Sequence, residues 1–131
     1  MWNGKPKFDY QDIKRETLPS GRVYDINGEK LPSVTTILSA TKSEESKAKL
    51  AAWRQREGEK KADQIRDNAA ARGTIMHRIL EGYIKGKGHM DLTDLGVEAG
   101  TMAQNIIDKG HFRPLTEVWG LEMPLWYPGL Y

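Results

Sequence analysis

The sequence predicts an α+β fold that is mostly helical, with a β-hairpin near the N-terminus and a strand near the C-terminus. Three observations lead to this prediction. Residues 22–26 alternate apolar and polar side chains before a turn dipeptide. Stretches between residues 43 and 109 repeat apolar side chains at helical spacing, and residues 115–127 alternate again. The length of 131 residues suits one modest domain.

The composition excludes several classes of protein. Cysteine is absent, which excludes disulfides and thiolate zinc sites. No stretch approaches the roughly 20 apolar residues of a membrane span, and we expect neither a signal peptide nor a membrane partner. The net charge is only +2, from 20 Lys and Arg against 18 Asp and Glu, so overall charge does not by itself indicate nucleic acid.

The N-terminal part is predicted to be an arm followed by a hairpin. Residues 1–20 are polar with scattered aromatics, and we expect a flexible arm there. Residues 22–26 should form a half-buried strand, Asn27-Gly28 a two-residue turn, and residues 29–31 the return strand. Pro32 cannot donate a hydrogen bond to a sheet, so the hairpin should end there.

A hydroxyl-rich segment follows the hairpin. Ser33 or Thr35 can cap a short helix that buries Val34, Ile37 and Leu38. The same hydroxyls and free backbone amides could instead bind an anion such as phosphate. Simple capping is the more common role of such residues, and the sequence leaves both roles open.

Helices should occupy the middle of the chain. The first has a capping sequence at Ser43 and should run to Glu57, where Gly58 can stop it. The expected helices after it cover residues 59–71, about 75–85 and 92–109. Between the first two of these, Arg72-Gly73-Thr74 should either kink one helix or separate two. Cations are interleaved with acids along these helices, which indicates either a solvated face or a surface that follows phosphates.

His77 and Glu81 are four residues apart on one of these predicted helices. This spacing places both side chains on one face, one turn apart. Imidazole and carboxylate can ligate a metal or carry protons. Such a pair is nevertheless more often a surface pair or a satisfied core histidine, so spacing alone does not assign it a function.

The predicted C-terminal strand carries a second carboxylate of interest. Alternation over residues 115–127 places Glu122 on the less apolar face, where it should be exposed, paired or bound to a metal. An unpaired strand rich in Trp, Leu and Met would aggregate. We therefore expect a homodimer partner, a second polypeptide or removed sequence to cover it.

Several of these segments, in this order, resemble a known family. They are the hairpin with Tyr24, Leu31-Pro32-Ser33-Val34-Thr35-Thr36-Ile37-Leu38, the helix with Trp53-Arg54, the block from Ala71 to Glu81, and Gly120-Leu121-Glu122-Met123-Pro124-Leu125. Residues 24–131 resemble the N-terminal half of phage-type exonucleases of the PD-(D/E)XK superfamily, in the RecB-like branch that includes the mitochondrial genome-maintenance exonuclease.

The resemblance implies a site and a fold. His77 and Glu122 would be metal ligands and catalytic residues, and Glu81 would support them by orienting neighbouring groups. Residues 21–131 would be the N-terminal part of the nuclease domain, with residues 115–127 as the first strand of an incomplete restriction-endonuclease-like sheet. The residues that would contact DNA, as a single strand or at ends, are Arg72, Ser33, Thr35, Thr36 and Arg54.

The chain departs from the family where it ends. Tyr131 lies where an Ala-Gly-Thr-x-Asp segment should begin, and the Asp/Glu-x-Lys motif that should follow is missing. His77 and Glu122 are too few ligands for Mg²⁺ or Mn²⁺, which we expect only in a completed site. The chain should therefore be inactive alone.

Three hypotheses follow from this departure. The first is a split metal-dependent DNA exonuclease, in which a second polypeptide supplies the missing motifs. The second is a non-catalytic regulator, derived from a nuclease, that binds DNA or a host protein. The third is the truncation of an ordinary exonuclease. In each case the resemblance implies a phage protein in the cytoplasm of a bacterial host.

Overall fold

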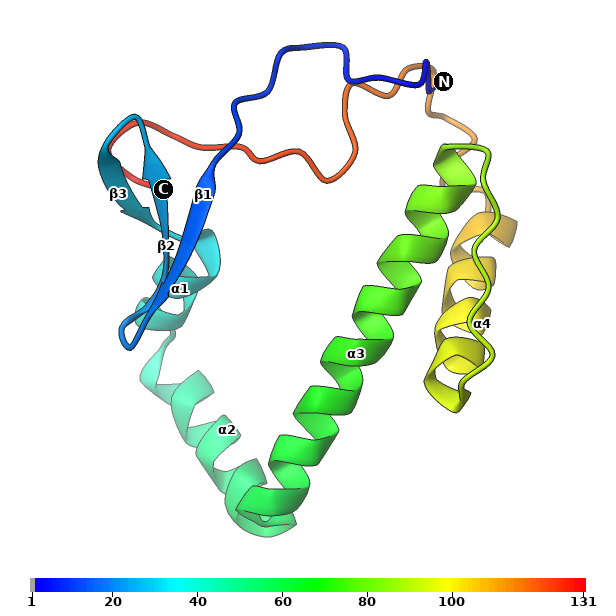
Figure 1. Ribbon diagram of the computed structural model, residues 1–131. Helices are drawn as coiled ribbons and strands as arrows, with labels where there is room; N and C mark the ends of the chain where they lie inside the picture. Colours follow the sequence, from blue (N-terminus) through cyan, green and yellow to red (C-terminus); the bar gives the residue numbers. More distant parts are fainter. Residues whose placement is uncertain (1) are drawn as a thin grey trace. The chain divides into compact units, whose positions relative to one another are not determined.

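The computed structural model describes residues 2–131 and confirms the predicted α+β class (Figure 1). The elements, in chain order, are β1 (Lys14–Leu18), β2 (Gly21–Ile26), β3 (Glu29–Pro32), α1 (Val34–Ala40), α2 (Glu44–Glu57), α3 (Glu59–Ile84) and α4 (Asp94–Asp108). They belong to two compact units. The helical unit comprises residues up to Phe8 and Arg54–Leu121, and the sheet unit comprises Asp9–Trp53 and Glu122–Tyr131.

The predicted hairpin is the centre of the sheet unit. β2 pairs with β3 in antiparallel register, with Ile26 opposite Glu29 and Val23 opposite Pro32. Asn27 and Gly28 both have positive φ, 53° and 87°, as a two-residue turn with the strand twist requires. The Asp25 carboxylate accepts a hydrogen bond of 2.9 Å from the backbone N–H of Gly28, which also stabilises this turn.

The predicted arm is shorter than expected because its C-terminal part forms β1. Lys14–Leu18 pairs antiparallel with β2, so the sheet has three strands in the order β1-β2-β3. All residues of β1 except Leu18 are exposed, so β1 buries too little apolar surface for the periodic pattern that identifies a strand. Its pairing with β2 defines it instead.

The sheet unit buries few side chains. Ile26 and Leu31 are almost completely buried, with 3% and 4% of their surface exposed. Of the two predicted caps, Ser33 and Thr35, it is Ser33 that caps α1, and it accepts a hydrogen bond from the backbone N–H of Thr36. The prediction that α1 buries Val34 and Leu38 is wrong, because both are substantially exposed.

The helices on either side of Gly58 begin and end where their capping residues predict. Ser43 accepts a hydrogen bond from the backbone N–H of Ser46 at the start of α2, and Gly58, with φ 86°, separates α2 from α3. α3 is one helix of 26 residues that continues through Arg72-Gly73-Thr74. Separation into two helices at these residues does not occur. The Thr74 hydroxyl is satisfied within the helix, where it donates to the carbonyl oxygen of Ala70.

α4 packs against α3, and the two helices lie side by side in Figure 1. Thr93 caps α4 and accepts a hydrogen bond of 3.0 Å from the backbone N–H of Gly96. The buried face of α4 consists of small residues, since Gly96, Ala99 and Ala103 are the buried ones. The larger apolar residues Val97 and Met102 of the same helix are exposed.

The N-terminal residues of the helical unit are held by Trp119. The backbone N–H of Lys7 donates to the Trp119 carbonyl oxygen at 2.7 Å, and the Phe8 ring contacts the indole edge to face. The ammonium group of Lys7 forms an ion pair of 2.8 Å with Glu117, and these contacts lower the pKa of Glu117, chiefly through the Lys7 hydrogen bond. Glu117 also accepts a hydrogen bond from the Trp119 indole N–H.

The predicted C-terminal strand is wrong. Residues 115–131, all of which the structure describes, contain no strand, and they therefore provide no first strand of a restriction-endonuclease-like sheet. Alternating apolar and polar side chains form a strand only where a neighbouring strand hydrogen-bonds to the backbone N–H and C=O groups. No strand pairs with these residues. Glu122 has φ 53° and Pro124 lacks an N–H donor, and both disfavour an extended ladder.

Among the described helices, none combines the length and apolar character of a membrane span.

Candidate functional site

A connected group of hydroxyls lies at the start of α1. The Ser33 hydroxyl is 3.0 Å from that of Thr35 and 2.8 Å from that of Thr36. Ser33 itself is buried, and its backbone N–H donates to the carbonyl oxygen of Arg22 on β2. The structure therefore brings together the three hydroxyls that the sequence analysis predicted to contact DNA, and it anchors them to the sheet.

These hydroxyls line an open hollow of about 680 Å³ on the sheet unit. Hydroxyls, one cation and backbone surround it, and the lining residues are Ser20, Gly21, Arg22, Ser33, Thr35, Thr36, Ser39 and Ala40. No acidic side chain lines the hollow. An arginine and several hydroxyl-bearing residues around one hollow are a composition that suits a phosphate oxygen.

Gly21 allows this hollow to form. Its φ of 127° is unfavourable for residues with a side chain, and a Cβ atom there would lie 3.0 Å from the Thr36 hydroxyl oxygen. The chain therefore reverses from β1 to β2 directly against α1. Thr36 can approach the sheet closely only because residue 21 has no side chain.

His77 and Glu81 lie one turn apart on α3, as the spacing predicted. His77 is exposed, whereas Glu81 is partly buried and forms an ion pair with Lys85 one turn further on. Arg72, on the same helix, forms an ion pair of 2.9 Å with Glu98 on α4. Two of the predicted site residues, Glu81 and Arg72, therefore have charged partners within the helical unit.

Arg54 also has acidic partners. Its guanidinium group lies 2.5 Å from the Glu59 carboxylate and 2.6 Å from that of Asp63. These contacts raise the pKa of Arg54, with the hydrogen bond to Glu59 as the largest cause. A phosphate would have to compete with two carboxylates for this predicted DNA contact.

The predicted metal ligands do not make a complete metal site. His77 lies in the helical unit and Glu122 in the sheet unit. Within the described chain, no three His, Asp or Glu side chains are grouped so that they could hold a metal ion. Mg²⁺ requires about six ligands, mostly oxygens, and the pair on α3 offers a nitrogen and a carboxylate that Lys85 already engages. The residues present therefore do not fit this cofactor without further ligands.

Arg22 is a candidate residue that the sequence analysis missed. The two-residue turn at Asn27-Gly28 pairs residues whose numbers sum to 55, such as 26 with 29 and 23 with 32. The same rule, extended past the end of the ladder, places Arg22 beside Ser33. The register of the predicted hairpin could therefore have indicated this cation.

Comparison with protein-family models, with curated proteins and with solved structures finds no match to this chain.

Proposed function

We propose that this chain is the N-terminal part of a metal-dependent DNA exonuclease, completed by a second polypeptide that carries the Asp and Asp/Glu-x-Lys motifs. The observation that carries the proposal is the arrangement of the Arg72–Glu81 block on one uninterrupted helix. Arg72, His77 and Glu81, which the resemblance to the PD-(D/E)XK exonucleases implicates, are thereby held at fixed positions on the same helix. In a bacterial host the protein would act in the cytoplasm.

The reaction in this proposal is hydrolysis of a phosphodiester. Mg²⁺ or Mn²⁺ would belong only to the completed site, because His77, Glu81 and Glu122 do not form a sufficient ligand set here. Within the sheet unit, the hydroxyls of the hollow and Arg22 would hold the strand. Within the helical unit, His77 would contribute to the completed metal site. Alone, the chain is expected to be inactive.

The test combines this chain with a candidate polypeptide carrying the missing motifs. We expect the mixture to degrade end-labelled single-stranded DNA with Mg²⁺, and His77→Ala to reduce the initial rate by roughly 10- to 100-fold, the usual range for metal-site neighbours. His111→Ala is the matched control, because His111 is an exposed histidine in the turn after α4. Absence of both degradation and co-elution with the candidate would contradict the proposal.

A second function, DNA binding without catalysis, is favoured by the hollow itself. It combines Arg22 with the hydroxyls of Ser33, Thr35 and Thr36, and it needs no metal. Under this alternative, His77→Ala would leave the biological activity unchanged. The two functions therefore make opposite predictions for the same variant.

Binding to the hollow can be measured separately from hydrolysis. We expect Arg22→Gln to weaken binding of a labelled single strand and to reduce the slope of log K against log salt by about one phosphate contact. Fluorescence anisotropy over a salt series would measure both quantities. Arg15→Gln is the control, since Arg15 is exposed on β1 and does not line the hollow. Equal effects of the two variants would rule out a specific role for the hollow.

A further inference from the structure

The junction between α2 and α3 consists of a single glycine. The Gly58 N–H donates to the Arg54 carbonyl oxygen at 2.9 Å, and its own carbonyl oxygen accepts from Ala62 N–H, also at 2.9 Å. No linker separates the two helices. A Cβ atom at residue 58 would meet no atom within 4 Å, so only the φ of 86° requires glycine here. The junction is therefore a point at which the backbone can turn without steric hindrance.

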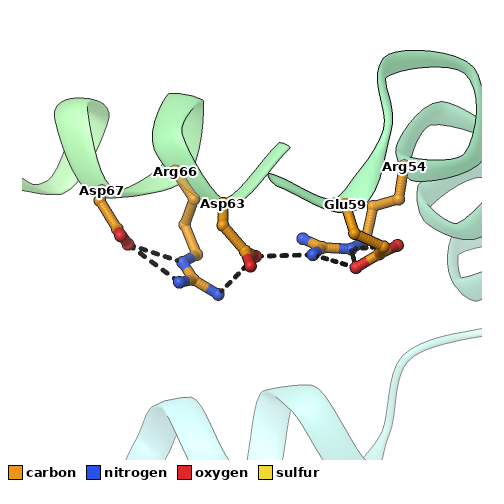
Figure 2. A network of polar contacts seen from close by, with 5 residues as sticks. All are labelled: Arg54, Glu59, Asp63, Arg66 and Asp67. Carbon is orange, nitrogen blue, oxygen red and sulfur yellow. Dashed lines mark hydrogen bonds and ion pairs between the residues drawn. The ribbon is translucent and has the colours of Figure 1, made fainter. Parts of the chain in front are cut away.

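Ion pairs connect α2 and α3 across this glycine, and α2 contributes the cation to some of them and the anion to another. Arg54 reaches forward from α2 to Glu59 and Asp63, and Figure 2 shows this row of side chains continuing along α3. Glu57 on α2 forms an ion pair of 2.9 Å with Lys61 on α3. We call these five side chains the Gly58 latch.

The two members of the latch on α2 are its most enclosed charges. The side chains of Arg54 and Glu57 are 24% and 25% exposed, whereas those of Glu59 and Lys61 are 73% and 65% exposed. Exposed single ion pairs contribute little, but one guanidinium group shared by two carboxylates is a more favourable arrangement. At the latch, the glycine lets the backbone turn freely, and the ion pairs favour one orientation of the end of α2 relative to the start of α3.

We propose that Gly58 is a hinge and that the ion pairs crossing it form an electrostatic latch, which holds the end of α2 on the start of α3 and opens at high ionic strength. Salt screens these pairs, whereas the apolar contacts of α3 with α4 are not weakened by screening. The latch therefore allows the junction to loosen while both helices stay folded.

Low pH should open the same latch. The hydrogen bond from Arg54 lowers the pKa of Asp63, with Arg66 adding a smaller effect, and the hydrogen bond from Lys61 lowers that of Glu57, with Arg56 adding to it. A lowered pKa in the folded state means that the contribution is complete above the ordinary values of 3.8 and 4.5. It is lost as pH falls below them and these carboxylates gain protons.

The test measures a distance across the hinge. Because the chain has no cysteine, spin labels at Gln55→Cys and Asn68→Cys, both exposed positions of the helical unit, report only on α2 and α3. At neutral pH and low salt we expect a narrow distance distribution by electron double resonance. It should broaden about two-fold at 1 M salt, where the Debye length falls to roughly 3 Å and exposed ion pairs re-form less readily once they have separated.

A matched pair of variants separates the latch from general charge effects. Arg54→Gln, added to the labelled chain, should broaden the distribution at low salt as 1 M salt does. Lys49→Gln should not, since Lys49 pairs with Glu45 within α2 alone. Circular dichroism should show unchanged helix content in both. A distribution that is insensitive to salt in the parent, or equal in the two variants, would overturn the proposal.

Discussion

Gly96→Ala is expected to destabilise the helical unit, although alanine is normally the better helix former. A Cβ atom at residue 96 would lie 2.5 Å from the backbone oxygen of Asp91, closer than real contacts allow. The segment that enters α4 would have to move. That movement would disturb the Thr93 cap and its hydrogen bonds with Asp91. Overpacking of this kind costs about 1–3 kcal/mol.

Urea unfolding, followed by circular dichroism at the helix band, measures this loss. Gly100→Ala is the matched control, because Gly100 lies one turn later in α4 and a Cβ atom there would meet nothing within 4 Å. It should gain about 0.5–1 kcal/mol, the ordinary advantage of alanine over glycine in a helix. Stabilisation by both substitutions would show that Asp91 does not press on Gly96.

Local signals in the sequence predicted much of this fold. The Asn27-Gly28 turn, the caps at Ser43 and Ser33 and the stop at Gly58 each depend on one to four neighbouring residues. The structure places all of them where the pattern does. The φ angle or hydrogen bond that each one requires is decided within the segment itself.

Features that depend on distant contacts were predicted less well. β1 has almost no buried residue, so its existence depends on its pairing with β2 and not on its own pattern. Residues 115–127 show the reverse, because they alternate like a strand but have no strand beside them. The buried face of α4 follows the same rule, since it is the packing of this helix in the unit that buries Gly96, Ala99 and Ala103.

The features of the candidate site can also be separated into those that depend on neighbouring residues and those that depend on distant contacts. The proximity of His77 and Glu81 and the hydroxyl cluster at Ser33 follow from helical spacing and capping, both of which are local. The ion pairs of Arg54 and Arg72 do not, because the partners are brought close by the turn at Gly58 and by the packing of α4 on α3. Sequence alone therefore indicated which cations are present but not which are engaged by acids.

Leu31→Ala is expected to have the largest effect on the sheet unit. Leu31 is 4% exposed, and Ile26 is the only other buried hydrophobic residue described in this unit. Truncating a buried leucine costs about 2–5 kcal/mol, and so small a core has few contacts that could compensate. Amide hydrogen exchange in β2 and β3 should accelerate by roughly 30-fold or more, since 1.4 kcal/mol corresponds to a factor of ten.

The same substitution should also disrupt the arrangement of the residues that line the hollow. β3 leads from Leu31 through Pro32 directly to Ser33, whose backbone N–H is hydrogen-bonded to Arg22 on the neighbouring strand. If the sheet opens, Arg22 and the hydroxyls lose their common anchor, and binding of a labelled single strand should weaken together with the exchange protection. Leu38→Ala removes the same atoms from a side chain that is 60% exposed, and it should change stability by less than about 0.5 kcal/mol. Unchanged protection of β2 and β3 in the Leu31 variant would mean that the sheet does not depend on this core.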